Sequence, residues 1–130
     1  MKKRIAVEGL RKDIVSLVCE MLEKLHHDIC YTDESAYKKH MYDYAFDLLE
    51  DPSDIVKNIV DSQPDLTIIC NARGYLPLLE HYSETADIPL LVLTGGGPDL
   101  IDKVKRYTPH VLEVPFRMQE LSNKVEEMLG

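Results

Sequence analysis

Five residues with reactive or ligand-binding groups stand where apolar segments of the chain end. They are Glu8, Cys70, Asn71, Thr94 and Gly95. The apolar segments read as strands of a parallel sheet, and ligands of such sheets bind beyond the carboxyl ends of the strands. We therefore expect the five residues to meet at one edge of the sheet, where they offer a carboxylate, a thiol, an amide and a hydroxyl beside an accessible backbone.

The segment Thr94-Gly95-Gly96-Gly97 is a candidate anion-binding loop. Glycines let a ligand approach the backbone closely, and Pro98 suits the first turn of a helix whose free N–H groups would face an anion. Arg73 could add a positive charge. A small-anion or nucleotide-binding regulatory domain is therefore one hypothesis. Three successive glycines also form ordinary turns, and the motif matches neither a P-loop nor a dinucleotide-binding fingerprint.

Cys70 is a candidate nucleophile or redox sensor. A reactive thiol needs a lowered pKa, supplied by a nearby cation, a histidine or a helix N-terminus. Arg73 is the only such group close in sequence, and the Glu8 carboxylate would oppose it. No Cys-x-x-Cys motif or Cys/His pair accompanies Cys70. These observations favour a buried structural cysteine and leave a thiol-based redox sensor as the weaker alternative.

Composition excludes several classes of partner. A formal net charge of −8 and a pI near 5.0 disfavour nucleic acid and anionic membrane surfaces, both of which require a basic face. No apolar run is long enough for a signal sequence or a membrane span. Three widely spaced cysteines form neither a disulfide framework nor a zinc pattern. We expect a cytoplasmic protein with reduced thiols, no metal ion and no cofactor.

Apolar periodicity predicts strands that alternate with helices. The expected strands cover residues 3–7, 29–32, 66–70, 88–93 and 111–114, and the expected helices cover 13–27, 52–63, 75–82, 98–107 and 121–129. Gly9 and the 94–97 segment are expected to form turns after their strands. This alternation predicts a three-layer α/β/α sandwich with a five-stranded parallel sheet and right-handed crossovers.

Residues 33–50 do not fit a short connection between the second strand and the following helix. The segment holds roughly a dozen residues more than such connections need, and it contains Tyr37, Tyr42 and Tyr44. Its periodicity fits a helix and a hairpin equally well. We interpret it as an insertion and a candidate interaction surface, since tyrosine combines a large contact area with a polar tip. Packing of these tyrosines onto the body of the domain is the alternative.

Four fragments of the chain resemble a known family. They are Ile5-Ala6-Val7-Glu8, Gln63-Pro64-Asp65-Leu66-Thr67-Ile68-Ile69, Ile88-Pro89-Leu90-Leu91-Val92-Leu93-Thr94-Gly95, and Val111-Leu112-Glu113-Val114-Pro115-Phe116 followed by Glu120-Leu121. In this order and spacing they resemble the bacterial receiver domain, the phospho-accepting module of two-component signalling. The resemblance covers nearly the whole chain apart from 33–50. It implies a doubly wound, flavodoxin-like (CheY-like) fold and a single domain over residues 1–130.

The resemblance also implies a phosphorylation site, and this chain departs from it. Receivers hold Mg²⁺ between two acidic residues after the first strand and the acceptor aspartate, and a lysine after the fifth strand pairs with the phosphoryl group. The first acid matches Glu8, but the second matches Gly9, the acceptor matches Cys70, and the lysine matches Val114. A hard dication prefers oxygen ligands, so a lone glutamate beside a thiol is a poor magnesium site. Of the residues that the resemblance implies for this site, Glu8 and Thr94 remain.

The sequence therefore predicts a degenerate receiver, with a remnant of the phosphorylation pocket formed by Glu8, Gly9, Cys70, Asn71, Thr94 and Val114. We expect a non-enzymatic regulatory domain that acts by protein–protein interaction, with a protein partner or a second copy of itself. In receiver-like domains, the fourth helix, fifth strand and fifth helix commonly form the contact face. Here that face includes Arg106, Tyr107 and Arg117.

Overall fold

The computed structural model describes residues 3–9, 12–25, 27–32, 52–70, 76–95 and 97–130. The strands are β1 (Arg4–Gly9), β2 (Asp28–Thr32), β3 (Leu66–Cys70), β4 (Leu90–Thr94) and β5 (Val111–Glu113). The helices are α1 (Lys12–Lys24), α3 (Pro52–Asp61), α4 (Leu76–Thr85), α5 (Pro98–Val104) and α6 (Met118–Leu129). Residues 33–50, with Tyr37, Tyr42 and Tyr44, lie outside the described residues.

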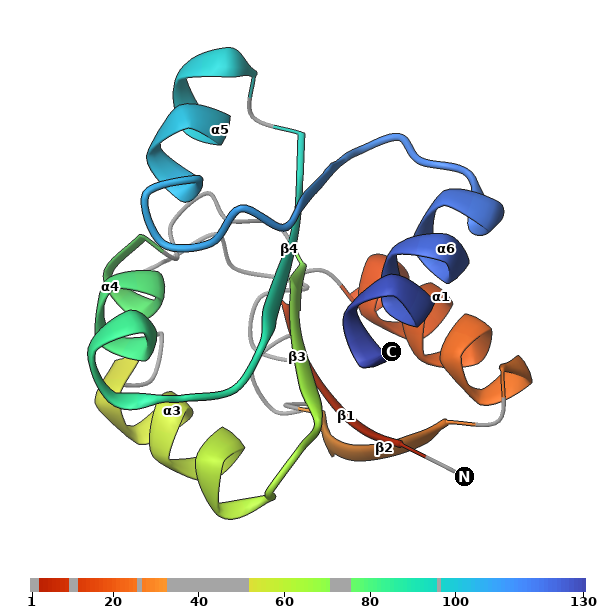
Figure 1. Cartoon of the computed structure of the whole chain (residues 1–130), viewed down its shortest axis with the longest axis horizontal. Coiled ribbons are helices and arrows are strands. Elements are labelled where there is room, and N and C mark those ends of the chain that lie inside the picture. Colours follow the sequence, from red (N-terminus) through yellow and green to blue (C-terminus); the bar gives the residue numbers. More distant parts are fainter. Residues whose placement is uncertain (1–2, 10–11, 26, 33–51, 71–75, 96) are drawn as a thin grey trace.

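The strands form one parallel sheet in the order β2-β1-β3-β4-β5, with helices on both faces. Helices α1 and α6 cover one face, and α3, α4 and α5 cover the other (Figure 1). The order of the strands reverses direction at β1, as it does in doubly wound folds. The predicted α/β class, a parallel sheet flanked by helices, is confirmed.

The sheet is buried on both faces because its central strands are continuously apolar. Every residue of β3 and of β4 is buried. Successive side chains of a strand point to opposite faces, so Ile68 packs in the core cluster under α1 and α6, while Ile69 packs in the cluster under α3 and α4. This alternation explains why neither strand has a polar face.

Several predicted boundaries were wrong. Helix α1 ends at Lys24 rather than at residue 27, α5 ends at Val104 rather than at residue 107, and α6 begins at Met118 rather than at residue 121.

Strands β1 and β4 also differ from their predicted ranges. Gly9 is the last residue of β1 and pairs with Cys70, and Thr94 is the last residue of β4 rather than part of a loop. Strand β4 begins at Leu90 instead of residue 88. The Ile88 carbonyl instead accepts a hydrogen bond from the Tyr82 hydroxyl at 3.0 Å, and Pro89 has no N–H to donate. In the described residues, no helix is both long and apolar enough to cross a membrane.

Candidate functional site

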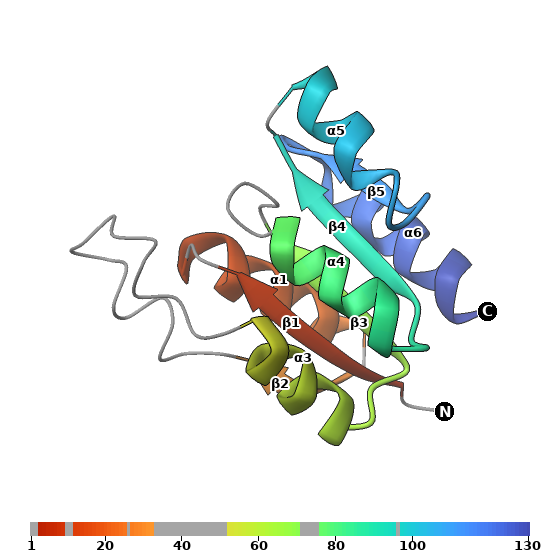
Figure 2. The same ribbon diagram turned by 90° about the vertical axis from the view of Figure 1, so that its left-hand side faces the viewer.

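Strands β1, β3 and β4 end side by side at one edge of the sheet. Gly9 lies opposite Cys70, and Cys70 lies opposite Leu93, one residue before Thr94. The Val114 N–H, just after β5, donates to the Thr94 carbonyl at 3.0 Å. In Figure 2 the arrowheads of β1 and β4 point the same way, toward this edge. The structure therefore brings together Glu8, Gly9, Cys70, Thr94 and Val114, while Asn71 and Arg73 lie outside the described residues.

Four of these residues are buried, and Gly9 is one of them. The exposed fraction is 0% for Glu8, 1% for Cys70 and 0% for Thr94. Burial raises the pKa of the Cys70 thiol, and the negative charges of Cys19 and Glu8 act in the same direction. The thiol is therefore protonated near neutral pH, and a protonated thiol is a poor nucleophile. This environment is the reverse of the one that a redox-sensing thiol requires.

Gly9 is tightly enclosed by two side chains. A Cβ atom added to Gly9 would lie 2.6 Å from Val15 Cγ2, on α1, and 3.0 Å from Cys70 Cβ. Contacts this short do not occur between carbon atoms without movement of the surroundings. The volume in which a side chain at position 9 would begin is thus occupied by Val15 and Cys70. Sequence reasoning assigned Gly9 to a turn, because the packing that requires glycine comes from residues on α1 and β3.

Val114 and Gly95 approach each other on the β5 side of this edge. A Cβ atom on Gly95 would lie 3.4 Å from Val114 Cβ and 3.3 Å from the Val114 carbonyl oxygen. Val114 is half-buried and packs against the core cluster beneath α1 and α6. It therefore behaves as an apolar filler at the position where the family resemblance implies a lysine.

The predicted anion-binding loop is divided between two environments. Thr94 is buried, and its hydroxyl finds no hydrogen-bond partner among the described residues. Gly95 is exposed, Gly96 lies outside the described residues, and Gly97 precedes α5 with a φ of +87°. Helix α5 is only 7 residues long. Anion binding by this loop stays a prediction.

The described residues contain no cluster of side chains that could bind a metal ion. Among these residues, no group of three or more His, Cys, Asp or Glu side chains could hold a metal ion. Glu8 and Cys70 are the only ionisable side chains of the predicted pocket, and a carboxylate beside a protonated thiol is a poor match for Mg²⁺.

The residues of the predicted contact face lie at opposite ends of β5. Arg106 and Tyr107 precede β5, whereas Arg117 follows it and begins α6. Both arginines are exposed and Tyr107 is half-buried. The backbone N–H of Arg117 donates to Glu120 Oε1 at 3.0 Å, which fixes the start of α6. Tyr107 instead lines a groove with Tyr82, at the end of the sheet opposite Cys70.

Several solved structures have folds similar to that of this chain. A response-regulator signal receiver domain from Bermanella marisrubri matches with a TM-score of 0.73 and 14% identity, over 100% of both chains. The signal receiver domain of a modulated diguanylate cyclase from Desulfovibrio desulfuricans G20 matches with a TM-score of 0.72 and 14% identity, over 99% of this chain and 94% of that one.

NtrX from Brucella abortus is a longer protein that contains a similar domain. It matches with a TM-score of 0.70 and 22% identity, over 99% of this chain but only 26% of NtrX. No protein-family model matches the sequence. No curated protein matches it either. The similarity to these structures shows that the chain has the fold of a response-regulator receiver domain.

Proposed function

We propose that this chain is a single receiver-like regulatory domain that acts by binding another protein and is not phosphorylated by the aspartyl mechanism. The receiver fold supports a regulatory role, and the replaced residues at the carboxyl edge of the sheet argue against the chemistry. We propose no catalytic step for the domain. Its partner is a different protein or a second copy of this chain.

The packing around Gly9 carries this proposal. In a receiver the corresponding side chain is one of the acids that hold Mg²⁺. Here Val15 and Cys70 fill the start of that side chain's volume, at 2.6 Å and 3.0 Å from the Cβ position. The neighbouring side chains on α1 and β3 therefore leave no room for an acidic side chain at position 9. An isolated substitution in an otherwise intact site would leave that volume open.

The chemistry of phosphoryl transfer leads to the same conclusion. Transfer depends on positioning and on neutralising the charge of the phosphoryl oxygens with a dication and a cationic side chain. Position 70 carries a thiol whose pKa burial raises, and position 114 carries valine. The residues at positions 70 and 114 therefore supply neither an ionised nucleophile nor a cation. Glu8 and Thr94 remain as buried polar residues on either side of β3.

Phosphorylation can be tested directly with a small phosphodonor. We expect no phosphoryl adduct by intact-mass spectrometry when the full chain is incubated with acetyl phosphate and Mg²⁺. A phosphorylatable receiver domain treated in the same buffer serves as the positive control. An acid-stable, base-labile adduct on any aspartate of this chain would overturn the proposal.

Partner binding needs its own test, because the face is proposed from the resemblance. Arg106 and Arg117 are both exposed, so charge reversal of either should leave the fold intact. If a second copy is the partner, Arg106→Glu with Arg117→Glu should lower the dimer fraction measured by light scattering. Lys57→Glu, at an exposed position of α3 outside the proposed face, is the matched control. A monomeric wild-type chain would exclude the homodimer and leave a different protein as the partner.

A further inference from the structure

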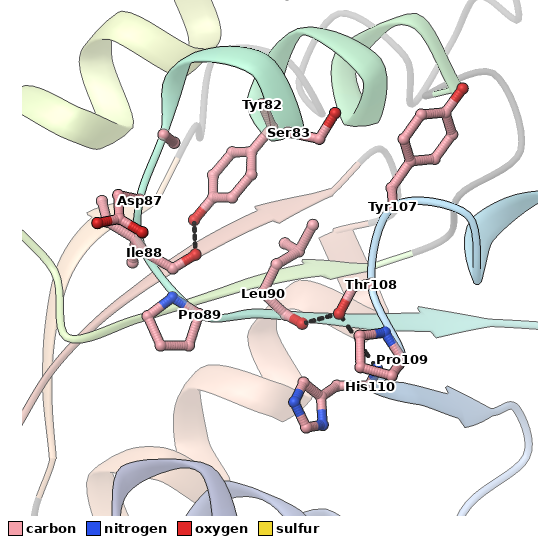
Figure 3. A pocket seen from close by; sticks show the side chains of 11 residues that line it. Tyr82, Ser83, Asp87, Ile88, Pro89, Leu90, Tyr107, Thr108, Pro109 and His110 are labelled. Atoms are coloured by element: carbon pink, nitrogen blue, oxygen red, sulfur yellow. Dashed lines mark hydrogen bonds between the residues drawn. The ribbon is translucent and has the colours of Figure 1, made fainter.

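A groove of about 440 Å³ lies at the amino end of β4, at the edge of the sheet opposite Cys70. Figure 3 shows Tyr82 and Ser83 of α4 along one side and the segment from Tyr107 to His110 along the other, with Leu90 between them. The volume falls within the usual range for pockets that bind small molecules, about 300–1,000 Å³. The proposed function gives this groove no role.

Hydrogen bonds to the sheet hold both sides of the groove in place. The Tyr82 hydroxyl donates to the Ile88 carbonyl at 3.0 Å and accepts from Thr67 Oγ1 at 2.9 Å. On the other side, Thr108 Oγ1 donates to the Leu90 carbonyl at 2.8 Å and accepts from the His110 N–H at 3.1 Å. A groove whose walls are fixed before binding loses little entropy when a ligand enters.

Two polar groups of the groove have no hydrogen-bond or ion-pair partner among the described residues. Asp87 is exposed and forms no ion pair with any described residue. His110 Nδ1 is buried and has no hydrogen-bond partner among the described residues. Pro89 and Pro109 line the groove without any N–H. A buried polar atom without a partner calls for one from a ligand or water.

No lysine or arginine lines the groove. Lys105 and Arg106 come just before Tyr107 in the chain, and neither contributes to the lining. The charge of the groove is therefore set by the Asp87 carboxylate, in a chain whose formal net charge is −8. The Asp87 carboxylate would repel an anionic ligand and attract a cationic one.

We propose that this groove binds a small organic ammonium compound: an apolar or aromatic body with a positively charged nitrogen. The ammonium group donates to the Asp87 carboxylate at one end of the groove. The body lies over Leu90 and reaches the ring of Tyr107 at the other end (Figure 3). An aromatic body gains from edge or face contacts with this ring.

The test uses phenethylammonium chloride as the probe, followed by amide NMR spectra of the full chain. We expect saturable shifts at residues 82–88 and at 107, 108 and 110, with a dissociation constant of about 1 mM, as suits a ligand of this size. Sodium chloride at equal concentration controls for ionic strength. The uncharged analogue 2-phenylethanol should bind about fivefold more weakly, because it lacks the ion pair.

Substitution of Asp87 tests whether its carboxylate binds the ammonium group. Asp87→Asn should weaken phenethylammonium binding about fivefold. Asp99→Asn removes an equally exposed acid in the first turn of α5, outside the groove, and should leave binding unchanged. Both positions are on the surface, so both variants should fold. Absence of saturable shifts, shifts confined to other residues, or equal binding by Asp87→Asn would each overturn the proposal.

Discussion

The polar residues at the two edges of the sheet differ in their exposure to solvent. At the carboxyl edge, Glu8, Cys70 and Thr94 are buried, and the side chains of Val15 and Cys70 pack closely against Gly9. At the amino edge, Asp87 and Tyr107 border an open groove of about 440 Å³. Parallel α/β sheets usually bind ligands at the carboxyl edge. In this chain the described residues around Gly9 at the carboxyl edge are packed like a core, whereas a groove lies at the amino edge.

The difference shows that the two edges of one sheet can be stabilised in different ways. Packing at the carboxyl edge depends on a mutually fitted set, in which Gly9, Val15 and Cys70 leave no room for an added carbon. The amino edge depends on hydrogen bonds between β4 and its flanking connections. Substitutions at the two edges should therefore have different costs.

The largest expected effect is the protection of Cys70 from alkylation. Its side chain is 1% exposed, and burial raises the pKa of its thiol, so reaction requires the protein to open. We expect iodoacetamide to modify Cys70 about a thousandfold more slowly in the native chain than in urea, as a stability of several kcal/mol implies. Mass spectrometry of tryptic peptides measures both rates. Cys70 reacting faster than the half-buried Cys19 would show that the carboxyl edge is open.

Adding one carbon at position 9 should destabilise the fold. Gly9→Ala places a methyl group against Val15 and Cys70, and overpacking of this kind costs about 1–3 kcal/mol. Chemical denaturation measures the free energy of unfolding. Gly95→Ala is the control, since the nearest atoms to its Cβ are at 3.3 and 3.4 Å and the residue is exposed. Equal free energies for the two variants would contradict the packing described for the carboxyl edge.

Two buried threonines give a matched comparison of the edges. Thr108 Oγ1 makes two hydrogen bonds, whereas Thr94 Oγ1 makes none within the described residues. Thr108→Val should lower the free energy of unfolding by about 1–3 kcal/mol, because it leaves the Leu90 carbonyl and the His110 N–H unpaired. Thr94→Val should not lower it, because the buried hydroxyl that it removes has no partner among the described residues. The reverse order would refute this contrast.

High pH should weaken the amino edge through Tyr82. Burial raises the pKa of Tyr82 from 10.0 to about 12, partly offset by its hydrogen bond with Thr67. The unfolded chain loses this proton first, so the free energy of unfolding falls as pH rises from about 10 to about 12. We expect a contribution of about 1–2 kcal/mol to that fall. Tyr82→Phe removes the proton, and its stability should therefore decline less steeply over the same range.

Sequence reasoning predicted the strands best where a local pattern determines them. The apolar run of β3 follows Pro64 and Asp65, and both of its predicted ends are correct. The Asp65 carboxylate accepts a hydrogen bond from the Arg4 N–H at 2.8 Å, an interaction across 61 residues that no local pattern reveals. The end of β1 was misplaced for the same reason, since the need for glycine at position 9 comes from Val15 and Cys70.

The groove had no signal in the sequence. Its lining comes from the end of α4 and from the connections before β4 and β5, and these segments meet only in the folded sheet. Tyr107 was predicted to belong to a contact face, but its neighbours across the groove could not be known without the strand order. The tyrosines of the segment 33–50 lie outside the described residues, and an interaction surface there stays a prediction.

The most direct test of the central claim is an NMR titration of the full chain with Mg²⁺ and beryllofluoride, a mimic of the phosphoryl group. We predict no saturable shift at Glu8, Gly9, Cys70 or Thr94, because the described part of the edge offers neither the acid pair nor the acceptor. A phosphorylatable receiver domain in the same buffer should respond strongly. Saturable shifts at these four residues, requiring both Mg²⁺ and beryllofluoride, would show that a working phospho-switch survives here.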